Sequence, residues 1–193
     1  LWCSCRIQVT DISRLHSLLS KTQFEPTDDD LSWLLGQDNF DSLLFIEADK
    51  VRQRIYGRQV YLRGLIEFTN YCKNNCLYCG LRRSNRLAER YRLTADEVLE
   101  CCTEGYNLGF RTFVLQGGED GALSDEWLTE LVGRIRTTFP EAAITLSLGE
   151  RSATSYRRLK EAGANRYLLR HEAANKELYS SLHPGMQGIE ARL

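Results

Sequence analysis

Residues 94–118, "TADEVLECCTEGYNLGFRTFVLQGG", contain a helical pattern that is followed at once by a strand pattern. Thr94 and Glu97 match the signature of a helix capping box, and apolar residues continue at helical spacing as far as Gly109. Residues 111–118 are short and apolar and end in two glycines, which is typical of a strand that ends in a turn. The stretch therefore predicts a helix and a strand of an α/β fold.

The same alternation extends in both directions along the chain. A strand pattern at residues 60–70 comes before this unit. After it come two further strand patterns, at 142–149 and 166–172, and three helix patterns, at 124–139, 152–164 and 175–183. Strands that alternate with helices form right-handed βαβ units, so we expect a parallel sheet with its functional groups at the carboxyl ends of the strands.

Four such units are fewer than the eight of a complete (β/α)₈ TIM-type barrel, which takes roughly 250 residues. We therefore expect residues 58–193 to form the amino-terminal half of a barrel, in a chain that is truncated. Residues 1–57 are expected to form a helical extension packed on that barrel. The helical patterns in this extension lie at 11–20, 27–36 and 40–57.

The composition is that of a globular protein, with 193 residues, 42% hydrophobic and 26% charged. No apolar run reaches the roughly 18 residues of a membrane span, and no secretory signal begins the chain, so we expect a cytoplasmic protein without a membrane partner. A net charge of −1 gives no general attraction for nucleic acid. The arginine-rich residues 82–92 are typical of a solvated face. Arg82 and Arg83 are also expected to stabilise the preceding loop electrostatically.

Three of the seven cysteines, Cys72, Cys76 and Cys79, fall within eight residues of "NYCKNNCLYCGLRR" (70–83). An odd number of cysteines without an export signal indicates reduced thiols. A structural zinc site takes four ligands, usually as two separated pairs, and an electron-transfer [4Fe–4S] cluster takes four thiolates. Three thiolates would hold three irons of such a cluster and leave the fourth iron open to another ligand.

The Cys-x₃-Cys-x₂-Cys spacing, with Tyr78 before the last cysteine, resembles the signature of the radical S-adenosylmethionine (SAM) superfamily. The resemblance implies a [4Fe–4S] cluster whose open iron binds SAM, which is then cleaved to a 5′-deoxyadenosyl radical. "QGGED" (116–120) is similar to the family's GGE motif, which implies that Gly117, Gly118 and Glu119 contact SAM. Alone, this sequence is also typical of a tight turn. No catalytic side chain is predicted.

Five segments resemble the HydE family of [FeFe]-hydrogenase maturases more specifically: "NNCLYCGLRRSN", "YRLTADEV", "VLQGGED", "TLSLGE" and "AGANRYLLRHEAAN". The resemblance implies that Glu172 and Arg192 contact SAM. It also implies that Thr145 and Arg170 line the substrate side of the cavity. Ser147 alternates with apolar residues in the same strand as Thr145, so we expect its hydroxyl to point into the barrel as well, and we assign it to cofactor binding.

The HydE resemblance further implies a small organometallic or amino-acid-derived substrate, the maturases HydG and HydF as partners, and an electron donor such as ferredoxin. Two near relatives share much of this half of the barrel and supply alternative functions: methylornithine synthase (PylB), a lysine mutase, and biotin synthase. A catalytically inert iron–sulfur-binding fragment is the alternative from another class.

Several of these residues also suit ordinary structural roles. Arg170 could form an ion pair at the barrel rim, Glu172 could cap the following helix, and Thr145 could simply favour a strand. Gly117 departs from relatives that have a serine at this position, which leaves only a backbone N–H toward the substrate side.

Overall fold

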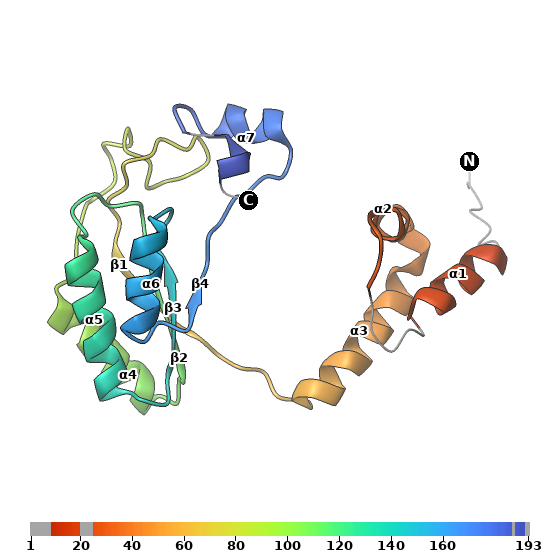
Figure 1. The fold of residues 1–193 in the computed structure, drawn as a ribbon, viewed down its shortest axis with the longest axis horizontal. Helices are drawn as coiled ribbons and strands as arrows, with labels where there is room; N and C mark the ends of the chain where they lie inside the picture. Colours follow the sequence, from red (N-terminus) through yellow and green to blue (C-terminus); the bar gives the residue numbers. More distant parts are fainter. Residues whose placement is uncertain (1–8, 20–24, 187, 192–193) are drawn as a thin grey trace. The chain divides into compact units, whose positions relative to one another are not determined.

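The computed structural model describes residues 9–19, 25–186 and 188–191. Along the chain the protein divides into two compact units, with the boundary between Val60 and Tyr61. Figure 1 shows the helices of the first unit and the sheet with its helices in the second.

The first unit is helical. Its elements are α1 (Val9–Leu19), α2 (Asp28–Leu35), the 3₁₀ turn η1 (Asp38–Phe40) and α3 (Asp41–Tyr56). A capping box begins α2, in which the Thr27 hydroxyl accepts the Asp30 N–H and the Asp30 carboxylate accepts the Thr27 N–H, both at 3.2 Å. These helices correspond to the three predicted patterns, while the packing of the extension on the barrel stays a prediction. None of the helices in the described ranges is long and apolar enough to cross a membrane.

The second unit contains a four-stranded parallel sheet with the strand order β1-β2-β3-β4. In chain order its elements are β1 (Gly64–Thr69), α4 (Ala95–Asn107), β2 (Thr112–Gly117), α5 (Asp125–Thr138), β3 (Ala143–Ser147), α6 (Ala153–Glu161), β4 (Arg166–Tyr167), α7 (Lys176–Leu182) and the 3₁₀ turn η2 (Ile189–Ala191). The predicted α/β class, with parallel strands in a partial barrel, is confirmed.

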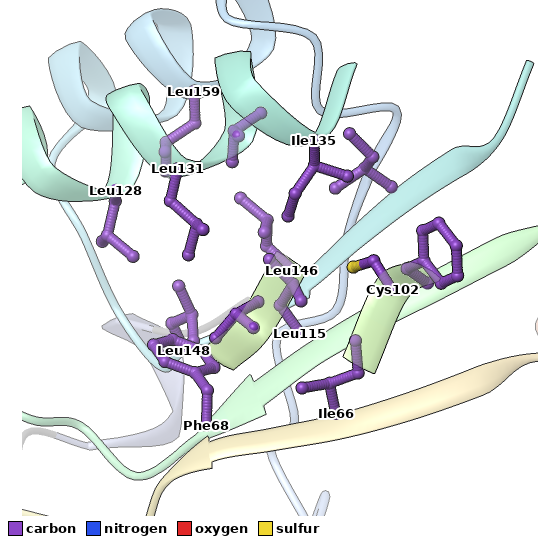
Figure 2. Close-up of a cluster of buried hydrophobic side chains, with 14 of the residues drawn as sticks. Ile66, Phe68, Cys102, Leu115, Leu128, Leu131, Ile135, Leu146, Leu148 and Leu159 are labelled. Carbon is purple, nitrogen blue, oxygen red and sulfur yellow. The ribbon is translucent and has the colours of Figure 1, made fainter. Parts of the chain in front are cut away.

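One face of the sheet packs on the helices and forms the core. The contacting residues are Ile66 and Phe68 of β1, Leu115 of β2, Leu146 of β3 and Leu148 after it, which meet Cys102 of α4, Leu128, Leu131 and Ile135 of α5, and Leu159 of α6 (Figure 2). Burying one such aliphatic side chain contributes about 2 kcal/mol. Because successive side chains of a strand alternate between its faces, Thr145 and Ser147 point to the opposite face, as predicted.

The fourth strand is shorter than predicted. The sequence predicted a strand over 166–172, but β4 ends at Tyr167 and only the Leu168 N–H, bonded to the Leu146 carbonyl at 2.8 Å, continues the pairing. The neighbouring strand β3 ends at Ser147 and the chain turns away at Gly149, where φ is +76°. Later residues therefore have no strand beside them to pair with.

Candidate functional site

The three cysteines lie on an irregular loop between the end of β1 and the start of α4. Asn70 anchors its start, since the side-chain amide donates to the Glu89 carbonyl at 2.6 Å and its oxygen accepts the Tyr91 N–H at 2.8 Å. Within the loop, the Cys79 N–H donates to the Cys76 carbonyl at 3.1 Å. These contacts hold a loop that has no regular secondary structure of its own.

Arg90 supports the same loop from within. Its guanidinium donates to four backbone carbonyls, those of Asn70 at 2.5 Å, Leu81 at 3.0 Å, Arg82 at 2.9 Å and Asn85 at 3.2 Å. A planar group with five N–H donors can satisfy several carbonyls at once, which a lysine ammonium does less well. Arg90 therefore holds both ends of the cysteine segment together.

The two arginines expected to brace the loop contact it less extensively. Arg82 donates from Nη1 to the Cys79 carbonyl at 3.2 Å, and Arg83 is tied by its backbone N–H to the Asn74 carbonyl at 2.8 Å. The role of Arg90 was not predicted, because the arginines of this stretch are indistinguishable by local pattern.

A cavity of about 480 Å³ lies at the carboxyl ends of the strands. The predicted site residues that line it are Cys72, Cys76, Cys79, Gly117, Gly118, Glu119, Ser147, Arg170 and Glu172. Its volume falls within the range of roughly 300–1,000 Å³ found for small-molecule sites. One cavity thus brings together residues from four separate segments of the sequence.

The cysteine thiols influence one another. Burial raises the pKa of the Cys76 thiol, and the nearby Cys72 and Cys79 thiols raise it further. Burial also raises the pKa of the Tyr78 hydroxyl, and the charge of Cys76 adds to that rise. Three ionised sulfurs would repel one another here, and bound iron would offset this repulsion because metal binding favours the thiolate.

The turn after β2 packs directly on the cysteine loop. The Lys73 N–H donates to the Glu119 carbonyl at 2.9 Å. A Cβ added to Gly118 would lie 2.7 Å from the Cys72 Cβ and 2.9 Å from the Tyr71 carbonyl carbon, closer than side chains normally approach. Glycine at this position therefore permits the turn to form one wall of the cysteine site.

The Glu119 side chain lies in a space that only a glycine at 149 leaves open. Its Oε2 is 3.3 Å from the Lys73 Nζ, and the side chain is 11% exposed. A Cβ on Gly149 would lie 2.6 Å from the Glu119 Oε1, and the φ of Gly149 is in the left-handed region that favours glycine. Gly149 was not predicted as a site residue, although it is the glycine of "TLSLGE".

The two hydroxyl residues of β3 differ in their access to the cavity. Ser147 lines it, whereas Thr145 does not. Thr145 is 5% exposed, and within the described ranges its hydroxyl has no hydrogen-bond partner. Its contact with a substrate therefore stays a prediction.

Arg170 and Glu172 reach the cavity from the loop between β4 and α7. Their side chains are 3.9 Å apart, between Arg170 Nε and Glu172 Oε1, and the φ of Glu172 is +64°. Non-glycine residues held in this conformation are uncommon and concentrate at functional sites. The alternative of a helix-capping Glu172 is wrong, because the Asn175 side chain caps α7 by accepting the Leu178 N–H at 2.8 Å. Arg192 lies outside the described residues.

Glu67 and Gln116 line the cavity although neither was predicted as a site residue. They are paired across β1 and β2, and the Gln116 Nε2 donates to the Glu67 Oε1 at 2.9 Å. Both follow core residues, Ile66 and Leu115, so strand alternation is the signal that could have found them.

The donor set fits the cofactors that the sequence implied. Three thiols around one cavity can each hold one iron of a [4Fe–4S] cluster. Within the described ranges, no group of three His, Cys, Asp or Glu side chains converges on a single metal ion. Glu119, Glu172 and Arg170 line the same cavity, so carboxylate and guanidinium groups lie in it together with the three thiols.

Known proteins resemble this chain over most of its length. The chain is 45% identical over 150 residues to the [FeFe] hydrogenase maturase subunit HydE of Thermotoga maritima, a match that covers 78% of this chain and 42% of that protein. The solved structure of methylornithine synthase (PylB) is 31% identical with a TM-score of 0.75, and the match covers 89% of this chain and 51% of that one.

A second solved structure has the same fold. The FeFe-hydrogenase maturase HydG from Carboxydothermus hydrogenoformans is 26% identical with a TM-score of 0.78, over 92% of this chain and 42% of that one. The chain thus spans about half or less of the length of these proteins. Residues 66–193, which contain the cysteine loop, the turn after β2 and the later strand ends, match the family described as the Radical SAM superfamily. The predicted resemblance is therefore confirmed, and the chain belongs to the radical SAM superfamily of enzymes.

Proposed function

We propose that this chain is part of a radical SAM enzyme of the HydE type, which acts in maturation of the diiron subcluster of [FeFe]-hydrogenase. The observation that carries the proposal is one cavity lined by Cys72, Cys76 and Cys79, in a chain that is 45% identical over 150 residues to a HydE. The whole protein would work in the cytoplasm.

The cysteines and the turn after β2 would hold the cofactors. Each of the three thiolates would bind one iron of a [4Fe–4S] cluster, which together with SAM supplies a 5′-deoxyadenosyl radical when both are bound. Gly117 and Gly118 would let the backbone approach SAM closely, since neither has a side chain to exclude it. The remaining residues proposed for SAM are Glu119, Ser147, Glu172 and Arg192.

Arg170 would orient the substrate. A guanidinium can bind a carboxylate through two parallel hydrogen bonds, which fixes direction as well as position. Thr145 is proposed as its companion on the substrate side. The substrate would be a small organometallic or amino-acid-derived molecule, with HydG and HydF as partner maturases and a ferredoxin-type protein as electron donor.

Methylornithine synthase is the alternative that a specific observation favours, since its solved structure covers 89% of this chain at 31% identity. Formation of 3-methylornithine from lysine would support this alternative over a HydE-type function. A biotin synthase-like function is a further alternative within the same family.

The test is anaerobic reconstitution of the chain with iron and sulfide, followed by reduction and addition of SAM. We expect an iron–sulfur cluster and release of 5′-deoxyadenosine. Cys76→Ser should abolish both, because one iron would lose its ligand, whereas the matched variant Cys101→Ser, at an exposed position of α4, should change neither. Bound zinc in place of a cluster would overturn the proposal, and a cluster without SAM cleavage would support an inert fragment.

A further inference from the structure

The segment that ends α7 contacts three consecutive residues of the cysteine loop. The Leu77 N–H donates to the Leu182 carbonyl at 2.9 Å, and the Cys76 and Met186 sulfurs are 3.8 Å apart. Between these contacts, the Tyr78 hydroxyl is 2.8 Å from Nε2 of a histidine at position 183. Figure 1 shows α7 and the loop that follows β1 at the same end of the sheet.

The contacts of the His183 ring determine which way the hydrogen bond to Tyr78 runs. Nδ1 lies 2.7 Å from the Tyr179 carbonyl, which can only accept, so Nδ1 carries a proton and, in the neutral ring, Nε2 is the acceptor. The Tyr78 hydroxyl therefore donates to His183. The ring also makes two aromatic contacts: it stacks on Tyr179 with 4.0 Å between centroids, and it forms a T-shaped contact with Tyr78 with 5.3 Å between centroids.

Burial of His183 makes the hydrogen bond to Tyr78 depend on an acceptor at position 183. His183 is 3% exposed, so an acceptor lost from its Nε2 position would not be replaced readily by water. Its partner Tyr78 lies between two of the three cysteines and lines the cavity. A change in the direction of the Tyr78 side chain would therefore be transmitted directly to the backbone turn from Cys76 to Cys79.

We propose that His183 is a positioning residue for the cysteine loop, which it orients through the Tyr78 hydroxyl. This role rests on the proposed cluster site, because the turn that His183 fixes supplies two of the three sulfur ligands. His183 itself contacts neither cluster nor substrate. It lies 105 residues from Tyr78 in the sequence, directly after the last residue of α7 and outside the cysteine motif.

The test is a double-substitution cycle with His183→Phe and Tyr78→Phe in the full chain. Both variants keep a ring and remove one side of the hydrogen bond. For each reconstituted protein, the measurements are the rate of iron loss to a chelator and the low-temperature EPR spectrum of the reduced cluster. We expect each single variant to lose iron about tenfold faster, the factor that corresponds to the free energy of one hydrogen bond, with an altered spectrum.

Two expected results distinguish a positioning role of His183 from a general loss of stability. The double variant should lose iron no faster than the single variant with the larger effect, because both substitutions remove the same interaction. His183→Gln, which retains an acceptor, should restore the spectrum in part. The matched control His16→Phe, at an exposed residue of the first unit, should leave iron loss and spectrum unchanged.

Additive effects of the two substitutions, or an unchanged spectrum and iron-loss rate in His183→Phe, would overturn the proposal. A failure of SAM cleavage alone would leave these measurements on the cluster possible. A failure of the proposed cluster site would look different, because the unsubstituted chain would then assemble no cluster. Urea unfolding of the chain without iron would still show coupling between Tyr78 and His183 in that case, so the hydrogen bond and the cluster site are tested separately.

Discussion

The Arg92 guanidinium forms two parallel hydrogen bonds with the Asp120 carboxylate, from Nε at 2.5 Å and from Nη2 at 2.9 Å. The carboxylate also accepts the Thr69 hydroxyl at 2.8 Å and the Ala122 N–H at 3.0 Å. The same guanidinium lies over the Tyr71 ring, 3.7 Å from its centroid. One ion pair thus joins the end of β1, the turn after β2 and the start of the cysteine loop.

Replacing Asp120 by asparagine should destabilise the second unit by about 2 kcal/mol, the size of a hydrogen bond to a charged group. The Asp120 side chain is 2% exposed, so water cannot readily replace the contacts that its carboxylate makes. Urea unfolding measures the change. Asp96→Asn is the matched control, because its ion pair with Arg134 is largely exposed, and it should cost less than about 0.5 kcal/mol. Equal losses in the two variants would contradict a special role for the buried Asp120 carboxylate.

The stabilisation by Asp120 should depend on pH. Burial raises the pKa of this carboxyl, but hydrogen bonds from Arg92, Ala122 and Thr69 outweigh burial and leave the pKa below its ordinary value. A carboxyl whose pKa is lower in the folded state stabilises the fold above its unfolded pKa of about 3.9, and this stabilisation is lost as the pH falls further. The difference in Tm between the unsubstituted chain and Asp120→Asn should therefore be constant from pH 7 to 5 and shrink below about pH 4. A difference that does not change down to pH 2.5 would contradict the assignment.

The order of helices and strands could be predicted because it depends on local patterns. Thr94 and Glu97 form the predicted capping box that begins α4, with the Thr94 N–H donating to Glu97 at 2.7 Å. The alternation in β3 placed Leu146 in the core and Ser147 toward the cavity. The end of β4 could not be predicted in this way, because a strand ends where its neighbour ends, and that depends on β3.

The site could be predicted only where its residues form a motif. The three cysteines and residues 116–119 of the "QGGED" turn are each close together in the sequence, and both groups line the cavity. The supporting residues are not local: Asp120 is 28 residues from Arg92, and the four carbonyls that bind Arg90 become neighbours only when the loop has folded. Sequence patterns do not encode such contacts, because each arginine of the stretch is equally compatible with a solvated position.

Gly118→Ala should disturb the cysteine site through lack of space. The added Cβ would lie 2.7 Å from the Cys72 Cβ, and the backbone of Tyr71 would have to move, at a cost of about 1–3 kcal/mol. We expect reduced iron incorporation after reconstitution together with a lower Tm. Gly121→Ala, in the same turn, has open space for its Cβ and should leave both unchanged. Normal iron content in Gly118→Ala would show that the loop can move without losing its ligands.

Gly149→Ala should displace the Glu119 side chain. Two effects add here, because the φ of +76° disfavours a side chain and the new Cβ would lie 2.6 Å from the Glu119 Oε1. Gly109→Ala separates the backbone effect from the steric effect, because the φ of Gly109 is +96° but nothing lies within contact distance of an added Cβ. We expect both variants to lose stability by about 1 kcal/mol from the backbone, and only Gly149→Ala to weaken SAM binding, measured by equilibrium dialysis. Equal SAM affinity in both would contradict a role for the Glu119 position.

Arg90→Lys should loosen the cysteine loop although the positive charge is kept. The guanidinium donates to four carbonyls, of which a lysine ammonium can reach fewer from one position. Two or more partly buried acceptors would then lose their partner, at about 1 kcal/mol each. Limited proteolysis should then cut within residues 70–90 faster than in the unsubstituted chain, and amide hydrogens of this loop should exchange faster. Arg86→Lys is the matched control, because Arg86 is exposed and has no hydrogen bond or ion pair within the described ranges. Since both variants keep the charge of the chain, a change confined to Arg90→Lys would follow from the geometry of the lost hydrogen bonds, and equal protection in the two would show that Arg90 does not hold the loop.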